Sequence, residues 1–82
     1  MDSFPKRARI LLLLKYLTEQ TDEQHPKKMA EILEYLEQSG VGAERKAVYA
    51  DIALLRDLGY DIIMTGDKTG GYFLGRRSME LA

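Results

Sequence analysis

The sequence predicts a mainly α-helical domain that ends in a small β-hairpin, and three observations predict it. Apolar residues recur at spacings of three and four in three successive segments, as on the buried face of a helix. Only a short stretch containing glycine separates the second segment from the third. Two short runs of β-branched and aromatic residues then flank a glycine-rich turn. Together these features predict three helices plus a wing, that is, a winged helix-turn-helix.

The first predicted helix spans residues 5–19. Its apolar stripe consists of Ile10, Leu13, Leu14 and Leu17. Ser3 precedes this helix as a potential N-cap, and Pro5 stands in the first turn, where its missing amide proton costs nothing. The polar residues 21–26, which end at a proline, then predict a loop.

The second predicted helix spans residues 28–38 and has the most regular periodicity in the chain. Its inward positions are Met29, Ile32, Leu33 and Leu36, and its wet side carries Glu31, Glu34 and Glu37. The turn 39–42 ends the helix. We expect Gly40 to adopt the left-handed conformation of a C-terminal cap and Val41 to enter the core below it.

The third predicted helix spans residues 43–58 and is followed by the hairpin. Its inward stripe is Val48, Ile52 and Leu55, and Gly59 is placed to end it with a positive φ. Residues 60–75 form the predicted wing, with strands at 60–64 and 72–74 around a turn-rich tip.

The length and composition exclude several classes of protein. Eighty-two residues form one small domain, which leaves no room for separate cofactor and substrate domains. The absence of cysteine excludes disulfides and thiolate metal sites, and it favours the reducing cytoplasm. The start has no signal-peptide layout, and the longest apolar run, Ile10–Leu14, is far too short to cross a membrane.

Catalytic and cofactor chemistry has no recognisable residue set. The single histidine, His25, lies in a predicted loop without a second histidine, so we expect no metal site. No nucleophile and base are spaced as a pair, and the hairpin glycines lack the context of a phosphate-binding loop. The sequence therefore predicts a protein that is not an enzyme and that needs no cofactor.

The charge is segregated along the chain although its sum is only −1. Residues 1–16 are basic, residues 17–40 are acidic, and residues 41–82 are balanced. A basic face therefore remains possible on a nearly neutral molecule, because the distribution of charge matters more than its sum.

The third predicted helix carries the candidate functional residues. In a helix-turn-helix this helix lies in the major groove of DNA, with its N-terminal part at the bases. Arg45 can donate two hydrogen bonds to a guanine, and Glu44 can accept one from a cytosine amino group. Lys46 can contact a phosphate or a base edge, and Tyr49 can contact a sugar, a methyl group or a phosphate. The small side chain of Ala47 allows close approach.

Three residues outside this helix complete the candidate set. Lys68 and Thr69, at the predicted wing tip, can reach the flanking DNA backbone. Lys28, with Lys27 beside it, can hold a phosphate near the start of the second helix.

Other polar and aromatic residues have plainer interpretations. We expect hairpin or core packing for Tyr60, Tyr72 and Phe73, and the edge of the core for Tyr16 and Tyr35. Asp51 and Arg56 are expected to make local ion pairs of little energetic value. The low net charge also leaves a second function open, namely a winged helix that binds a protein partner instead of DNA.

The sequence also resembles a known family. The segments 43–52, 58–62, 70–74 and 77–81, together with Leu55, resemble the N-terminal winged helix of the WYL-domain transcriptional regulators of bacteria. The early run 10–16 and the loop 21–26 fit the same pattern, so the resemblance spans nearly the whole chain.

The resemblance implies sequence-specific binding of double-stranded DNA, as a homodimer in the full-length protein. It implies a DNA-binding domain over residues 1–75 and the start of a linker over 76–82. A C-terminal WYL domain would follow and bind an effector ligand. Two positions depart from the family pattern: Gly42 replaces a frequent serine cap of the third helix, and Lys28 replaces a common threonine cap of the second.

Overall fold

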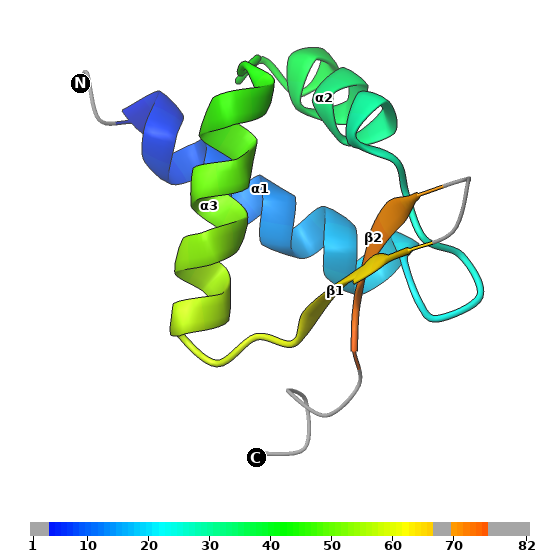
Figure 1. Ribbon diagram of the computed structural model, residues 1–82. Helices are drawn as coiled ribbons and strands as arrows, with labels where there is room; N and C mark the ends of the chain where they lie inside the picture. The colour runs from blue at the N-terminus through cyan, green and yellow to red at the C-terminus, as the bar shows by residue number, and fades with distance from the viewer. Residues whose placement is uncertain (1–3, 67–69, 76–82) are drawn as a thin grey trace.

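Three helices and one antiparallel hairpin make up the fold, which confirms the predicted fold class. The computed structural model describes residues 4–66 and 70–75, with side chains from Arg7 onward. Along the chain the elements are α1 (Phe4–Gln20), α2 (Met29–Gln38), α3 (Arg45–Asp57), β1 (Ile62–Thr65) and β2 (Gly71–Leu74) (Figure 1). The arrangement is that of a small winged-helix domain.

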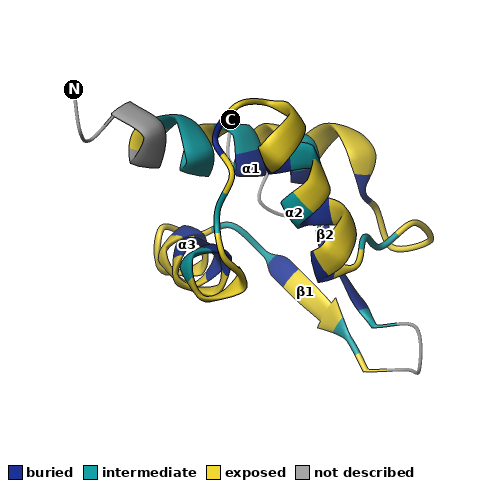
Figure 2. Ribbon diagram, turned by 90° about the horizontal axis from the view of Figure 1, so that it is seen from above, coloured by how far each residue is buried: buried dark blue, intermediate teal, exposed yellow. Residues whose placement is uncertain are grey.

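The elements form two sides with the core between them. Seen from above, α3 and β1 run along one side, and α1 and α2 lie on the other (Figure 2). The helices meet through their predicted apolar stripes, and the largest fully buried side chains are Leu13, Leu17, Ile32, Leu36 and Val48. Burial of these stripes supplies the main driving force for folding.

The hairpin is part of a slightly larger sheet than the sequence predicts. In the hairpin Ile62 pairs with Leu74, and Thr65 pairs with Gly71. On the other edge of β2, Lys27 and Tyr72 exchange backbone hydrogen bonds of 2.9 and 2.8 Å. The predicted loop 21–26 is thus followed by a strand-like contact. All four residues of β2, the strand with a neighbour on each side, are buried, whereas in β1 only Ile62 is buried and two residues are exposed.

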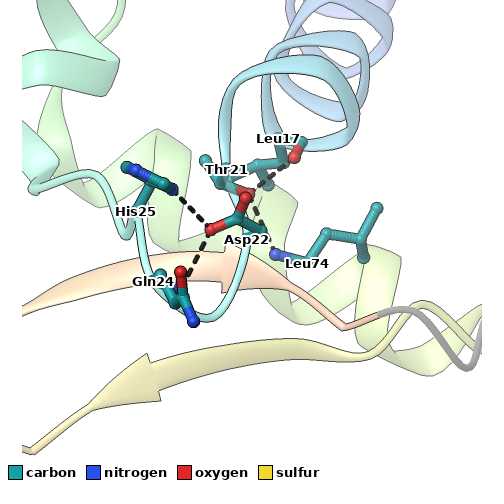
Figure 3. Close-up of polar contacts among 6 residues, drawn as sticks. All are labelled: Leu17, Thr21, Asp22, Gln24, His25 and Leu74. Carbon is teal, nitrogen blue, oxygen red and sulfur yellow. Dashed lines mark hydrogen bonds and ion pairs between the residues drawn. The ribbon is translucent and has the colours of Figure 1, made fainter.

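The hydroxyl of Thr21 joins α1 to the sheet. It donates a hydrogen bond to the carbonyl of Leu17 (2.6 Å) and accepts one from the amide of Leu74 (3.0 Å) (Figure 3). Thr21 is only 8% exposed, so both contacts are shielded from water. This single buried hydroxyl therefore satisfies a helix carbonyl and a strand amide that would otherwise lose their water partners.

The helix ends follow the predicted pattern at their C-termini. Gly40 and Gly59 have φ values of +87° and +108°, and Val41 is buried beneath the first of these turns. The predicted start of the third helix was wrong by two residues. Its N-cap is Glu44 and its first residue is Arg45, so Gly42 does not occupy the cap position suggested by the resemblance.

The second helix begins one residue later than predicted, after Lys28. The backbone amide of Lys28 donates to the carboxylate of Glu31 at 3.0 Å, which places a negative charge at the positive end of the helix dipole. The expected N-cap Ser3 and the expected linker 76–82 lie outside the described residues. Within the part of the chain that the structure describes, no helix is long and apolar enough to cross a membrane.

Candidate nucleic-acid interface

Helix α3 has one buried face and one exposed face. The buried face holds Val48, Ile52 and Leu55, each at most 3% exposed. Arg45, Lys46 and Tyr49 are all exposed in the first two turns, and Tyr49 retains 47% of its accessible surface. The outward residues predicted from the sequence therefore do lie on one solvent-facing side of α3, as Figure 2 shows for the helix as a whole.

The N-terminus of α3 presents backbone donors together with two cationic side chains. Glu44 caps the helix in an extended conformation, and its carbonyl accepts hydrogen bonds from the amides of Ala47 and Val48. The side chain of Glu44 makes no capping hydrogen bond to the first turn. Arg45 and Lys46 therefore start the helix where the dipole already favours an anion. The negative carboxylate of Glu44 weakens this attraction, so the N-terminus of α3 attracts an anion only moderately.

An ion pair across the domain holds α3 against α1. Nε of Arg9 lies 2.6 Å from Oδ2 of Asp51, and Nη2 lies 3.1 Å from Oδ1. The hydrogen bond to Asp51 raises the pKa of Arg9, and partial burial opposes it. The prediction of a local, weak ion pair for Asp51 was wrong, because the carboxylate is only 7% exposed and its partner stands 42 positions away. A chain position alone does not reveal such a long-range partner.

Arg56 also differs from its prediction. Its Nε donates a hydrogen bond of 2.9 Å to the carbonyl of Ile62 at the start of β1, so it ties α3 to the hairpin instead of making a local ion pair. Together with the contact between Arg9 and Asp51, this bond fixes α3 on both flanks. The orientation of the exposed face is thereby set by two polar contacts as well as by the core.

Aromatic residues lie where α3 meets the hairpin. Burial raises the pKa of Tyr72; the neighbouring Tyr49 raises it further, and the nearby charges of Arg56 and Arg45 lower it. Tyr72 and Phe73 are 7% and 8% exposed, which confirms their prediction as packing residues. Tyr60 is half-buried and packs against the core. The exposed Tyr49 of α3 therefore adjoins the hairpin. We call the flank of α3 next to the hairpin, which carries Arg45, Tyr49 and Arg56, the hairpin edge of α3, and a molecule bound to α3 would also contact it.

Of the residues of the hairpin edge, Arg56 is the one that is not predicted from the sequence as a functional residue. It follows Arg45 by eleven residues and Tyr49 by seven, which are whole numbers of helical turns. That spacing places all three on one flank of α3. This helical spacing is visible in the sequence, but the sequence-based expectation for Arg56 is a local ion pair.

Of the remaining candidate residues, Ala47 lies on α3 and Lys28 lies just before α2. Ala47 is half-buried, so less of its surface is open to the close approach that its small side chain was expected to allow. Lys28 is exposed just before α2, and the adjacent Lys27 approaches Glu31 at 3.9 Å. Lys68 and Thr69 lie outside the described residues. The acidic side chains Glu31, Glu34 and Glu37 are exposed on α2. Within residues 4–66 and 70–75, no group of three or more histidine, aspartate or glutamate side chains is placed to hold a metal ion.

No protein family, curated protein or solved structure matched the chain. The likeness to the WYL-domain regulators therefore remains a prediction from the residue pattern.

Proposed function

We propose that this chain is the DNA-binding module of a transcriptional regulator that reads double-stranded DNA with α3. One observation carries the proposal: Arg45, Lys46 and Tyr49 are exposed together on the first two turns of α3, beside the hairpin. A helix of 13 residues is about 20 Å long, and the major groove is about 12 Å wide, so α3 can enter the groove with its exposed face.

Each residue has a role that suits its place on α3. Arg45, at the first helical position, is the residue for a bidentate contact with guanine. Lys46, one position later, supplies a compact charge for a phosphate. Tyr49 lies one turn further along and adjoins the hairpin. There its hydroxyl can donate a hydrogen bond to a phosphate of the DNA backbone beside the wing. The acidic residues of α2 would repel phosphate and are expected to face away from the duplex.

The rest of the proposal rests on the resemblance to the WYL-domain regulators. It includes a bacterial, cytoplasmic regulator, a homodimer of the full-length protein, and an effector bound by a further C-terminal domain. There is also a physical reason to expect dimerisation. A domain with a net charge of −1 gains little from long-range attraction to DNA, so two half-site contacts would compensate for a weak single contact.

The test is a selection of bound duplexes from a random library, followed by titration of the selected duplex over a salt series. We expect one enriched sequence element and an affinity that falls as the salt concentration rises. No enrichment, together with no binding at about 50 mM salt, would contradict the proposal.

A second function is favoured by a different observation. Leu54 and Leu58, in the C-terminal part of α3 and at its end, are 48% and 66% exposed. Exposed apolar side chains on one helix are typical of a surface that binds protein. If α3 binds a protein partner, Leu54→Ser and Leu58→Ser would weaken that binding and Arg45→Ala would change it little, whereas Arg45→Ala would weaken the binding of DNA.

A further inference from the structure

A shallow cleft between α1 and α2 combines aromatic rings with carboxylates. Its volume is about 290 Å³, and we call it the acidic-aromatic cleft. It is lined by Tyr16 of α1 and by Glu31, Glu34, Tyr35 and Gln38 of α2. Neither α3 nor the hairpin contributes a lining residue, so the cleft is separate from the surface of α3 that is proposed to bind DNA.

The two tyrosines form a rigid platform. Their ring centroids lie 4.4 Å apart with an interplanar angle of 27°, so the rings are stacked. Both side chains are half-buried and pack against the hydrophobic core, which restricts their rotation. The stack therefore presents the electron-rich surface of tyrosine at a fixed place beside α2.

The carboxylates of the cleft are only partly neutralised. Glu31 accepts a hydrogen bond from the backbone of Lys28, and Nζ of Lys27 lies 3.9 Å from it. Glu34 accepts a weak hydrogen bond of 3.5 Å from the side-chain amide Nε2 of Gln38. Among the residues that the structure describes, no lysine or arginine lies within ion-pair distance of Glu34. The cleft therefore keeps a negative charge that a bound cation could neutralise.

The surroundings of Tyr16 are consistent with this negative potential. Burial raises the pKa of Tyr16, and the charges of Glu31 and Glu34 raise it further. Lys15 of α1 lies nearby, but Glu19 holds its Nζ at 2.9 and 3.0 Å. The basic residue closest in sequence to the tyrosine is thus already engaged.

Aromatic rings beside an open carboxylate suit a guanidinium group. A planar, weakly hydrated guanidinium can lie on a tyrosine ring and donate two hydrogen bonds to one carboxylate at the same time. Phosphate, in contrast, is repelled by both glutamates. We propose that the acidic-aromatic cleft binds an arginine side chain in a basic segment of a partner protein.

The test uses the full chain and a defined probe, the peptide acetyl-Gly-Arg-Gly-Arg-Gly-amide, with amide chemical shifts as the readout. We expect the shifts to concentrate around Tyr16 and along residues 31–38. The corresponding lysine peptide should bind about two- to fivefold more weakly, since an ammonium lacks the planar stacking contact. Spermidine serves as the free-cation arm: binding as tight as that of the arginine peptide would overturn the assignment to a protein side chain.

Matched variants locate the binding. Glu34→Gln should weaken the arginine peptide about two- to fivefold, whereas Glu37→Gln removes the same charge from α2 outside the cleft and should change it little. Tyr35→Phe should retain binding, and Tyr35→Leu should weaken it. Thermal denaturation of each variant checks that the fold is intact.

Two further results would overturn the proposal. Equal weakening by Glu34→Gln and Glu37→Gln would show general attraction to an acidic surface. Concentration-dependent self-association that moves the resonances of the cleft would show that a second copy of the chain occupies it. Neither result depends on whether α3 binds DNA, because the titration contains none.

Discussion

The guanidinium of Arg9 on α1 and the carboxylate of Asp51 on α3 form a two-bond ion pair across the domain, with distances of 2.6 and 3.1 Å. Their side chains are only 18% and 10% exposed. Helix α3 crosses in front of α1 (Figure 1), and the ion pair adds a directional restraint to their non-directional apolar packing. The exposed face of α3 therefore depends in part on a residue of the first helix.

Arg9→Met is expected to destabilise the protein by about 3 kcal/mol, because it leaves the shielded carboxylate of Asp51 without its partner. Chemical denaturation measures the loss. The double variant Arg9→Met with Asp51→Leu should recover most of the stability, since both charges are then absent. A single variant as stable as the unchanged chain would show that the pair contributes nothing.

The fold was predictable because helical periodicity and turn chemistry are local signals. The stripes of Leu13, Ile32 and Val48 identify the three helices, and all three residues are completely buried. The pairing of Lys27 with Tyr72 was not predictable, because a single bridge far from the hairpin in sequence leaves no alternating pattern. Sequence distance likewise concealed the partner of Asp51.

The candidate interface was predictable in part. The outward positions of Arg45, Lys46 and Tyr49 follow from the helical period once the inward stripe is known. The structural role of Arg56 does not follow, because a backbone carbonyl as acceptor carries no residue-specific signal. The half-burial of Ala47 depends on how α3 packs against its neighbours, which the period of one helix cannot specify.

Thr21→Val is expected to destabilise the protein by about 1–3 kcal/mol, because the shielded amide of Leu74 loses its acceptor. Valine keeps the shape of threonine, so the lost hydroxyl dominates the effect. Hydrogen exchange at the Leu74 amide should accelerate in the variant. Thr21→Ser retains the hydroxyl and is the control (Figure 3). If serine and valine variants exchange equally fast at Leu74, the hydroxyl is not what protects this amide.

Acidification is expected to titrate Asp22 below the usual aspartate range. The hydrogen bond from His25 (2.8 Å) lowers the pKa of Asp22, and the backbone amide of Gln24 (2.9 Å) lowers it further (Figure 3). Because the folded-state pKa is lowered, the contribution to stability is complete above the ordinary aspartate pKa. It is lost as the pH falls through the lowered value.

Carboxyl chemical shifts measured against pH check this prediction. His25→Ala should move the midpoint of Asp22 back towards the ordinary value. Gln24→Ala keeps the backbone donor and should leave the midpoint in place. An unchanged midpoint in the His25 variant would contradict the assigned cause.

Gly71→Ala is expected to cost about 1–3 kcal/mol, since residue 71 has a φ of +146° and an added Cβ would lie 3.0 Å from Cβ of Pro26. The contact falls where Lys27 pairs with β2, so this bridge should open first, with faster exchange at the Tyr72 amide. Gly66→Ala meets nothing within 4 Å and is the matched control. Equal stability of the two alanine variants would refute the close approach.

Arg45→Ala is expected to weaken binding to a selected duplex by about 1–3 kcal/mol and to relax the preference at one base position. Alanine is a good helix former, so α3 should persist. Lys46→Ala should instead weaken all sequences about equally and reduce the salt dependence by about one counterion. Titration of the selected duplex and of single-base variants over a salt series measures both effects.

Arg45→Lys separates the two kinds of contact, because lysine keeps the charge of arginine but cannot make its bidentate contact with guanine. The variant should retain the salt dependence of the unchanged chain and lose the preference at the same position that Arg45→Ala relaxes. If Arg45→Lys keeps the full sequence preference, Arg45 contacts phosphate only. Other exposed groups of α3 would then have to recognise the bases, and Tyr49 would be the next residue to substitute.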